Sequence, residues 1–208
     1  MVALRTRYLE VLKKNHQEKQ VRNIPQLEAS LSEIWGVTKK RSPLDDGNEV
    51  IRKLQEKLNT FNRSELQKQM HEVMIKCCNK IIFGNETVVR WEALIRQKYK
   101  WKDMRQEQII TAPRRFGKTY AVAMFVVALA LAKPGVEISI FSTGARASGQ
   151  DTGMMGKVKE FMKGHFQIPD SAIVKDRDEH FFVKIGGVVS KIHAYPGSVD
   201  TNVTFISR

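Results

Sequence analysis

Cysteine is scarce in this sequence of 208 residues: the only two, Cys77 and Cys78, are adjacent. Neighbouring residues of a helix point to different faces and rarely bond to each other, so a disulfide-stapled fold is excluded and a reducing compartment is expected. A zinc site would need two further ligands at suitable spacing. His71 is the one histidine nearby, and no metal-binding cluster is predicted around the two thiols.

Long apolar runs are also missing. Residues 121–132 are apolar throughout, but a helix that spans a bilayer requires roughly 20 such residues. The first residues, MVALRTRYLEVLKKN, carry too much charge for a secretory signal. A soluble protein of the cell interior is therefore expected.

Acidic residues are few relative to basic ones. The chain holds 22 Asp and Glu against 35 Lys and Arg, a formal net charge of +13 at pH 7. This balance favours a polyanionic partner, nucleic acid first and an anionic membrane surface second, while an inert basic surface is the alternative. With 42% hydrophobic residues the chain is able to bury a core, and its length suits about one domain or slightly more.

Residues 1–100 are predicted to form an α-helical N-terminal region, because apolar residues recur there at helical spacing. Ser64 and Gln67 have the spacing of a capping box that opens one helix, and Thr87 is expected to cap the next. The apolar sets are Leu4, Tyr8, Val11 and Leu12; Leu27, Leu31, Ile34 and Trp35; Ile51, Leu54, Leu58 and Phe61; Leu66, Met70, Val73, Met74 and Cys77; and Val88, Trp91, Leu94 and Ile95.

A polar segment with proline and glycine, residues 38–48, is predicted to be a loop or linker within this region. It contains Lys39, Lys40 and Arg41. Three consecutive basic residues fit either a nuclear-import patch or an ordinary solvated turn, and the sequence leaves both interpretations open.

The pattern changes near residue 107. A short strand is predicted at 108–111, an apolar helix at 120–131 and a second strand at 136–141. Strand, loop, helix and strand in this order form a βαβ unit, so residues 101–208 are predicted to be a partial α/β domain with a parallel sheet. Residues 156–165 are expected to be helical, and the strands 181–185 and 188–195, joined by Gly186-Gly187, to form a hairpin.

Between the first strand and the helix lies the sequence TAPRRFGKTY, residues 111–120. A phosphate-binding loop points backbone N–H groups at the phosphates, and the helix that follows adds its positive end. In such a loop Gly117 allows close approach of the backbone, Lys118 neutralises the β- and γ-phosphates, and Thr119 places its hydroxyl on Mg²⁺. Ala112 stands where the usual pattern opens with glycine. A chance Gly-Lys-Thr in a basic protein is the alternative.

Two arginines, Arg114 and Arg115, lie inside this loop. A guanidinium at that position would lie beside the triphosphate and reach the γ-phosphate from the same chain. An arginine supplied in this way accelerates phosphoryl transfer by roughly 10³–10⁵. At least one of the two is therefore expected to be catalytic, and contact with DNA or with a neighbouring acidic side chain is the competing role.

The run Pro113-Arg114-Arg115-Phe116-Gly117-Lys118-Thr119 resembles the deviant Walker A loop of large terminase subunits, the DNA-packaging motors of tailed phages and herpes-like viruses. The segment ISIFSTGARAS, residues 138–148, is similar to the segment that follows the second core strand in that family. The likeness covers residues 105–150 well and the helical front portion only in general character.

The resemblance implies a P-loop NTPase fold and a complete protein that hydrolyses ATP, with Mg²⁺, to drive double-stranded DNA into a capsid. It makes Arg114, Arg115 and Lys118 catalytic, Arg114 as the trigger of hydrolysis, and Thr119 the metal-binding residue. Further partners would be a capsid portal, a small terminase subunit and identical copies in a ring, with no membrane. The protein would act in the nucleus or the cytoplasm of the host cell. The nucleotide-binding residues would be Ala112, Pro113, Arg114, Arg115, Phe116, Gly117, Lys118, Thr119 and Tyr120.

Polar residues also follow the strand predicted at 136–141. Ligands of open α/β sheets bind at the carboxyl ends of strands, so Thr143 and Arg146 are candidates to contact DNA phosphate or to couple nucleotide state to DNA grip. An ordinary strand-to-helix turn capped by Ser148 is the equally weighted alternative.

An ATPase of this kind needs an acidic pair at the end of a buried strand, an aspartate for Mg²⁺ and a glutamate to activate water. Asp178-Glu179 is the one pair at a plausible offset, and a charged turn before Phe181 is the preferred interpretation. We expect the acidic strand and the family's nuclease beyond residue 208, in a longer chain or a second polypeptide. The 208 residues alone are expected to bind nucleotide weakly with negligible turnover.

Two other functions remain open: a superfamily 2 helicase-like ATPase, and a basic nucleic-acid-binding scaffold with an inactive nucleotide site. Helicases more often have glycine or serine spacing without two loop arginines. Loss of ATP binding in a Lys118→Ala variant would argue against the scaffold. The adenine contact is undecided among Trp91, Arg96, Gln97 and Gln106.

Overall fold

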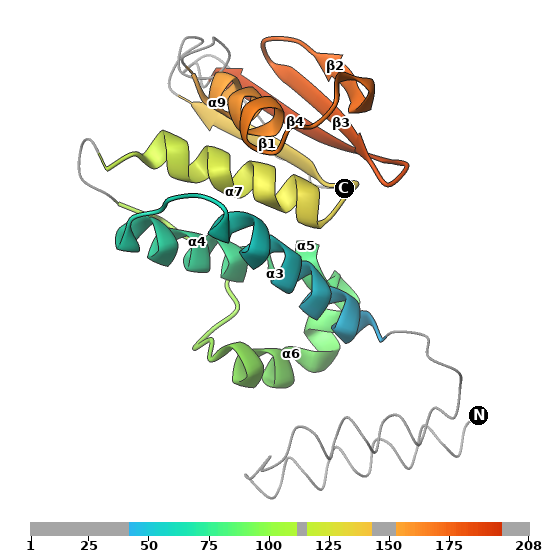
Figure 1. Cartoon of the computed structure of the whole chain (residues 1–208). Coiled ribbons are helices and arrows are strands. Elements are labelled where there is room, and N and C mark those ends of the chain that lie inside the picture. Colours follow the sequence, from blue (N-terminus) through green and yellow to red (C-terminus); the bar gives the residue numbers. More distant parts are fainter. Residues whose placement is uncertain (1–41, 112–115, 143–152, 197–208) are drawn as a thin grey trace, which may run out of the picture. The chain divides into compact units, whose positions relative to one another are not determined.

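The computed structural model describes residues 42–111, 116–142 and 153–196. The chain divides into two units after residue 41, and all of the described residues belong to the second unit (Figure 1). The helical sets predicted before residue 41 and the basic run 39–41 lie outside the described residues.

Four helices open the described part. They are α3 (Pro43–Asn59), α4 (Glu65–Cys77), α5 (Asn79–Phe83) and α6 (Asn85–Tyr99). The predicted apolar face of α3 is confirmed, since Ile51, Leu54 and Leu58 are almost fully buried. The predicted capping box of α4 is confirmed as well: the Gln67 amide N–H donates to the Ser64 hydroxyl and the Gln67 side chain accepts from the Ser64 N–H.

Two local predictions in this region are wrong. Residues 43–48 belong to α3 and not to a loop, because Ser42 and Asp45 form a second capping box and Pro43 occupies the first helical position, where its missing N–H costs nothing. Thr87 does not cap α6. That helix begins two residues earlier, at Asn85, after Gly84 with φ of 85°.

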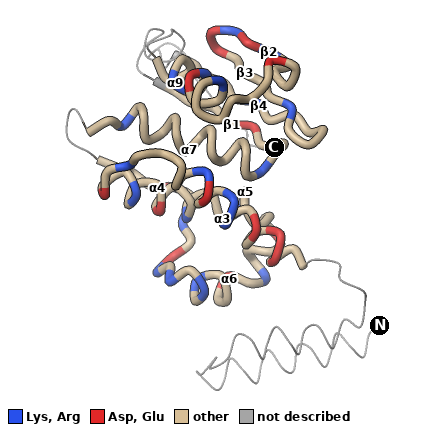
Figure 2. Tube along the Cα trace, viewed as in Figure 1, with Lys and Arg blue, Asp and Glu red and all other residues tan. Residues whose placement is uncertain are grey.

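Helix α7 (Lys118–Ala132) confirms the predicted apolar helix. It is apolar on every side and carries no charge between Lys118 and Lys133 (Figure 2). A helix with this composition must be covered all round. It contacts α3 and α4 on one side and α9 (Met154–Glu160) on another, and the hydroxyl of Ser190 donates to its Ala130 carbonyl from the sheet. Helix α7 is thus the centre of the core.

Among the described residues, the sheet has four strands in the order β1-β4-β3-β2. They are β1 (Glu137–Ser142), β2 (Ile173–Asp176), β3 (His180–Ile185) and β4 (Val188–Pro196). The pair β1–β4 is parallel, and the pairs β3–β4 and β2–β3 are antiparallel. The architecture is therefore mixed α/β. The predicted hairpin is confirmed, with Gly186 and Gly187 both at positive φ, as its two-residue turn requires.

Between β1 and the hairpin lie α9, the π-helix η1 (Phe161–His165) and the short 3-10 helix η2 (Asp170–Ala172). The first two confirm the helix predicted at 156–165. Asp178 and Glu179 occupy the turn from β2, an edge strand, to β3, in agreement with the preferred interpretation.

The strand predicted at 108–111 is absent from the described sheet. These residues have no regular structure, and Ile109 is 88% exposed. A strand forms only where a second strand satisfies its N–H and C=O groups, and the described neighbour of β1 is β4. The prediction of a βαβ unit that starts at residue 108 is therefore wrong, and the sheet is mixed where a parallel one was expected.

Candidate functional site

The start of α7 is set by Gly117. This residue is in the left-handed conformation, φ 82° and ψ 30°, and α7 follows from Lys118. A Cβ at this position would be strained and would lie 3.2 Å from Nε2 of Gln67, the capping-box residue of α4. Glycine is therefore the residue that suits the turn into α7.

The first turn of α7 is exposed and has no described side-chain cap. Lys118 and Thr119 are both exposed, and no acidic residue lies in this turn. The first N–H groups of a helix have no partner within the helix and carry a partial positive charge, which Lys118 increases. This end of α7 is suited to an anionic group, and the Thr119 hydroxyl is available as an oxygen ligand for a hard cation such as Mg²⁺.

Tyr120 joins the first turn of α7 to α9 and η1, which follow β1 in the chain. Its ring contacts the Phe161 ring at 6.0 Å between centroids, and the Lys157 Nζ lies 4.8 Å from the Tyr120 centroid. The hydrogen bond to Glu160, and to a smaller extent the one to Tyr120, raises the pKa of Lys157. Tyr120 therefore packs against the α9–η1 segment, in addition to following the Gly-Lys-Thr sequence.

A buried histidine fixes the same turn from the other side. His71 is 1% exposed, and its Nε2 lies 2.8 Å from the Ala121 carbonyl. The Arg63 Nη1 donates to His71 Nδ1 at 3.0 Å, so Nε2 carries the proton and donates to Ala121. Burial lowers the pKa of His71, which keeps the ring neutral near pH 7. Arg63, in turn, donates to Asn59 at 2.6 Å.

Sequence reasoning missed this chain of hydrogen bonds. A single histidine and a single arginine eight residues apart carry no motif, and the contact of His71 with Ala121 spans 50 residues. The one available signal is a polar residue among the apolar positions of α4, which by itself is typical of a satisfied core histidine.

Next to Phe116 lies a small, mainly apolar cavity of about 230 Å³. Phe116 contributes from the loop, Ile110 and Thr111 from the segment before it, and four residues from α4. The α4 residues are Leu66, Gln69, Met70 and Val73. The cavity is smaller than the roughly 300–1,000 Å³ typical of small-molecule sites.

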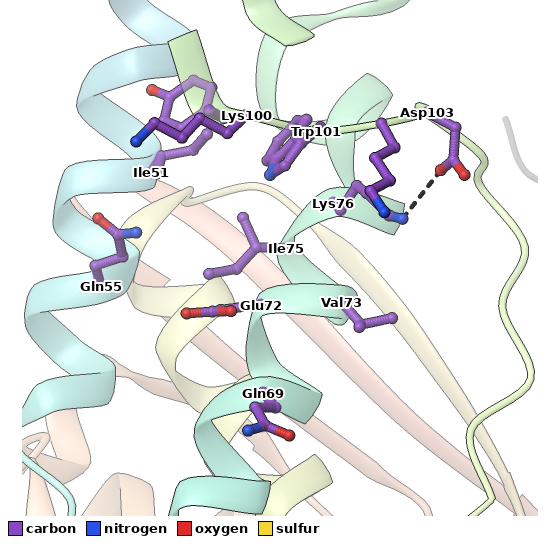
Figure 3. A pocket seen from close by; sticks show the side chains of 12 residues that line it. Ile51, Gln55, Gln69, Glu72, Val73, Ile75, Lys76, Lys100, Trp101 and Asp103 are labelled. Atoms are coloured by element: carbon purple, nitrogen blue, oxygen red, sulfur yellow. Dashed lines mark hydrogen bonds and ion pairs between the residues drawn. The ribbon is translucent and has the colours of Figure 1, made fainter. Parts of the chain in front are cut away.

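A second hollow, of about 540 Å³, lies between α3, α4 and residues 99–103 (Figure 3). The Lys76 Nζ and the Asp103 carboxylate close one side at 3.0 Å, and this contact lowers the pKa of Asp103. Trp101 stacks on Tyr99 at 5.0 Å. Burial raises the pKa of Tyr99 to about 12, and its hydroxyl donates to Asn48. These contacts tie the segment after α6 to α3 and α4.

The structure therefore groups Phe116, Gly117, Lys118, Thr119 and Tyr120 at one helix end. Ala112, Pro113, Arg114 and Arg115, together with Thr143 and Arg146, lie outside the described residues. The candidate adenine contacts Trp91, Arg96 and Gln97 are carried by α6, which packs mainly on α5 and α3. Figure 1 shows α6 apart from α7.

Within residues 42–111, 116–142 and 153–196, no cluster of three or more His, Cys, Asp or Glu side chains has the geometry of a metal site. Of the helices described, none has the length and apolar character to cross a bilayer. Comparison of the chain with protein-family models, with curated proteins and with solved structures finds no match.

Proposed function

We propose that the loop 112–117 and the first turn of α7 bind the triphosphate of ATP with Mg²⁺, in a P-loop NTPase of the large terminase kind. Lys118 neutralises the β- and γ-phosphates and Thr119 is a ligand of Mg²⁺. Arg114 or Arg115 reaches the γ-phosphate when it is transferred. The mixed α/β architecture is compatible with this proposal and does not single it out.

One observation carries the proposal. Gly117 turns the chain in a left-handed conformation directly into a helix whose first turn has no described cap and no acid, with Lys118 and Thr119 exposed there. A Gly-Lys-Thr that occurred by chance would have no reason to coincide with such a helix end.

As a complete protein, the proposed motor moves double-stranded DNA into a capsid. The net charge of +13 suits contact with DNA phosphates, and Thr143 and Arg146 are the proposed contacts or coupling residues. A portal, a small terminase subunit and identical copies in a ring are the partners that the resemblance implies.

The test is calorimetric titration of the chain with Mg-ATP. We expect Lys118→Ala to weaken binding by about tenfold or more, because a charge-assisted hydrogen bond contributes roughly 1.5–3 kcal/mol. Lys133→Ala, which removes the same charge just beyond the other end of α7, is the matched control and should bind as the unmodified chain does. Equal affinity of the two variants, or no heat at millimolar Mg-ATP, would overturn the proposal.

A basic nucleic-acid-binding scaffold is the second candidate, and one observation favours it. Residues 107–111, which lead into the loop, form no strand, whereas a phosphate loop normally follows one. DNA affinity that is unchanged in Lys118→Ala, combined with no nucleotide binding, would support this alternative.

A further inference from the structure

One face of the sheet carries a set of rings that the proposed nucleotide site does not use. Side chains alternate between faces along a strand, and Phe181, Val183, Ser190, Ile192 and Ala194, all 0% exposed, point to the face that α7 and α9 cover. Their neighbours along the strands point to the other face. Among these are Phe141, His180, Phe182, His193 and Tyr195, which we call the ring face.

Strand register brings these rings together. Phe141 lies opposite Tyr195, and His180 lies opposite His193. The Tyr195 ring is stacked on Phe141 at 5.4 Å and on His193 at 5.8 Å between centroids, the latter pair only 4° from parallel. Phe182 adds an edge contact to His193 at 5.3 Å. The five rings therefore form one continuous cluster across β1, β4 and β3, in which His193 is buried and the other four rings are partly exposed.

The two histidines of the ring face contact each other through their ring nitrogens. Their Nδ1 atoms are 2.9 Å apart, so one donates a proton and the other accepts it. Burial lowers the pKa of His193, although Glu137, with its Oε1 3.2 Å from His193 Nε2, opposes this effect. The lowered pKa favours the neutral form of the His193 ring near pH 7.

Cations border the rings. Lys175 places its Nζ 5.1 Å from the Phe182 centroid, and the register sets Lys191 opposite Phe182 and Lys184 next along β3 on the same face. Glu137 is the acidic residue among the described strand positions of this face, and its carboxylate lies 3.7 Å from Lys191. The ring face thus has an excess of positive charge at its margin.

We propose that the ring face binds single-stranded nucleic acid, with bases stacked on the exposed parts of Tyr195 and Phe182 and phosphates held by Lys184 and Lys191. Rings recognise the flat face of any base, and lysines recognise the backbone, so this surface is selective for unpaired strands and tolerant of sequence. In a duplex the base faces are already stacked and the rings cannot reach them. The lysines at the margin favour a polyanion such as nucleic acid over a partner protein whose surface carries few acidic residues.

This inference does not depend on ATP binding, and its experiment is done without nucleotide. Fluorescence anisotropy measures the binding of the full chain to labelled dT20 and, separately, to a labelled 20-base-pair duplex, each at several salt concentrations. We expect dT20 to be preferred, and Tyr195→Leu or Phe182→Leu to weaken its binding by about fivefold or more, since one stacked base contributes roughly 1–3 kcal/mol. Leucine keeps these positions apolar.

A second variant tests the lysines separately. The slope of log affinity against log salt is negative, and Lys184→Gln with Lys191→Gln should make it less steep by about 1.4, at roughly 0.7 for each phosphate contact to a single strand. Lys53→Gln with Lys98→Gln removes the same charge from α3 and α6 and should leave the slope unchanged. Because these four side chains are at the surface, the comparison holds even if a ring variant fails to fold.

Direct stacking has its own readout. In Tyr195→Trp, added dT20 should quench and shift the new indole emission, measured as the difference from the unmodified chain with its three native tryptophans. Equal binding of duplex and dT20, unchanged affinity in the folded ring variants, or equal salt slopes for the two lysine pairs would overturn the proposal. A Lys118→Ala variant that loses ATP binding and keeps dT20 binding would separate this surface from the nucleotide site.

Discussion

The two ends of α7 differ in how their polar groups are satisfied. At the carboxyl end, the fully buried Ser190 hydroxyl donates to the Ala130 carbonyl and accepts from the Gly135 N–H at 3.0 Å. At the amino end, Lys118 and Thr119 are exposed and no described side chain caps the helix. The carboxyl end of α7, which we call the closed end, therefore contributes mainly to stability. The amino end, which we call the open end, is the end able to bind a ligand.

The largest expected effect is a difference in the free energy of unfolding between substitutions near the two ends of α7. Leu129 is 3% exposed within the core, so Leu129→Ala should lower the free energy of unfolding by about 2–5 kcal/mol. Lys118→Ala, at the exposed end, should change it by less than about 0.5 kcal/mol. Urea unfolding followed by circular dichroism measures both. Equal losses would show that the amino-terminal turn is as much a part of the core as Leu129.

The next effect concerns the hydrogen bonds that hold the open end in place. His71→Leu removes the donor to Ala121 and leaves Arg63 without its ring acceptor, which should cost about 1–3 kcal/mol. Replacement of Lys157 by Met, on the other side of the turn, should cost less, because its ion-pair partner Glu160 is exposed and the pair is solvated. The same urea experiment ranks the two, and a reversed order would contradict the role given to His71.

His71 also predicts a pH dependence. Its folded-state pKa is lowered by burial, so below the unfolded value of about 6.5 the unfolded chain binds more protons than the folded one. Stability should therefore be complete above pH 6.5 and fall as the pH decreases below it, by at most about 1.4 kcal/mol per pH unit for this group. His193 acts in the same direction, so a His193→Gln background isolates the contribution of His71. If the free energy of unfolding depends on pH in the same way in His71→Leu, His71 is not the source of the pH dependence.

The smallest effect sharpens the comparison at the junction itself. Gly117→Ala places a side chain at φ 82° and close to Gln67, at a cost of about 1–2 kcal/mol. Gly164→Ala, in η1, meets no atom within 4 Å and has no positive φ, so it is the control and should be nearly neutral. If Mg-ATP affinity falls in Gly117→Ala and not in Gly164→Ala, the conformation of this glycine matters for binding as well as for folding.

Local signals predicted most helices correctly. The capping box at Ser64, the apolar period of α3 and the all-apolar α7 each depend on residues within a few positions of one another. The helix start at Ser42 was available from the same kind of signal, Ser-Pro-x-Asp, and was obscured by the polar residues around it. The hairpin β3–β4 was equally accessible, because two glycines between alternating strands specify its turn.

Other parts could not be predicted in this way. The segment 108–111 has the composition of a strand, yet composition does not provide the partner that a strand requires. The pairing of β1 with β4 joins residues more than fifty positions apart, and the ring face exists only because of that register. The contact of His71 with Ala121 likewise depends on how α4 packs against α7.

By itself the sequence determined the helices with their caps, the hairpin turn, the basic charge and the Gly-Lys-Thr at the start of α7, because each of these follows from neighbouring residues. Only the tertiary structure decided the mixed sheet, the burial of α7 on all sides, the hydrogen bonds that fix its first turn, and the rings gathered on one sheet face. These features arise from contacts between distant segments, whose free energy depends on the packing of the whole unit.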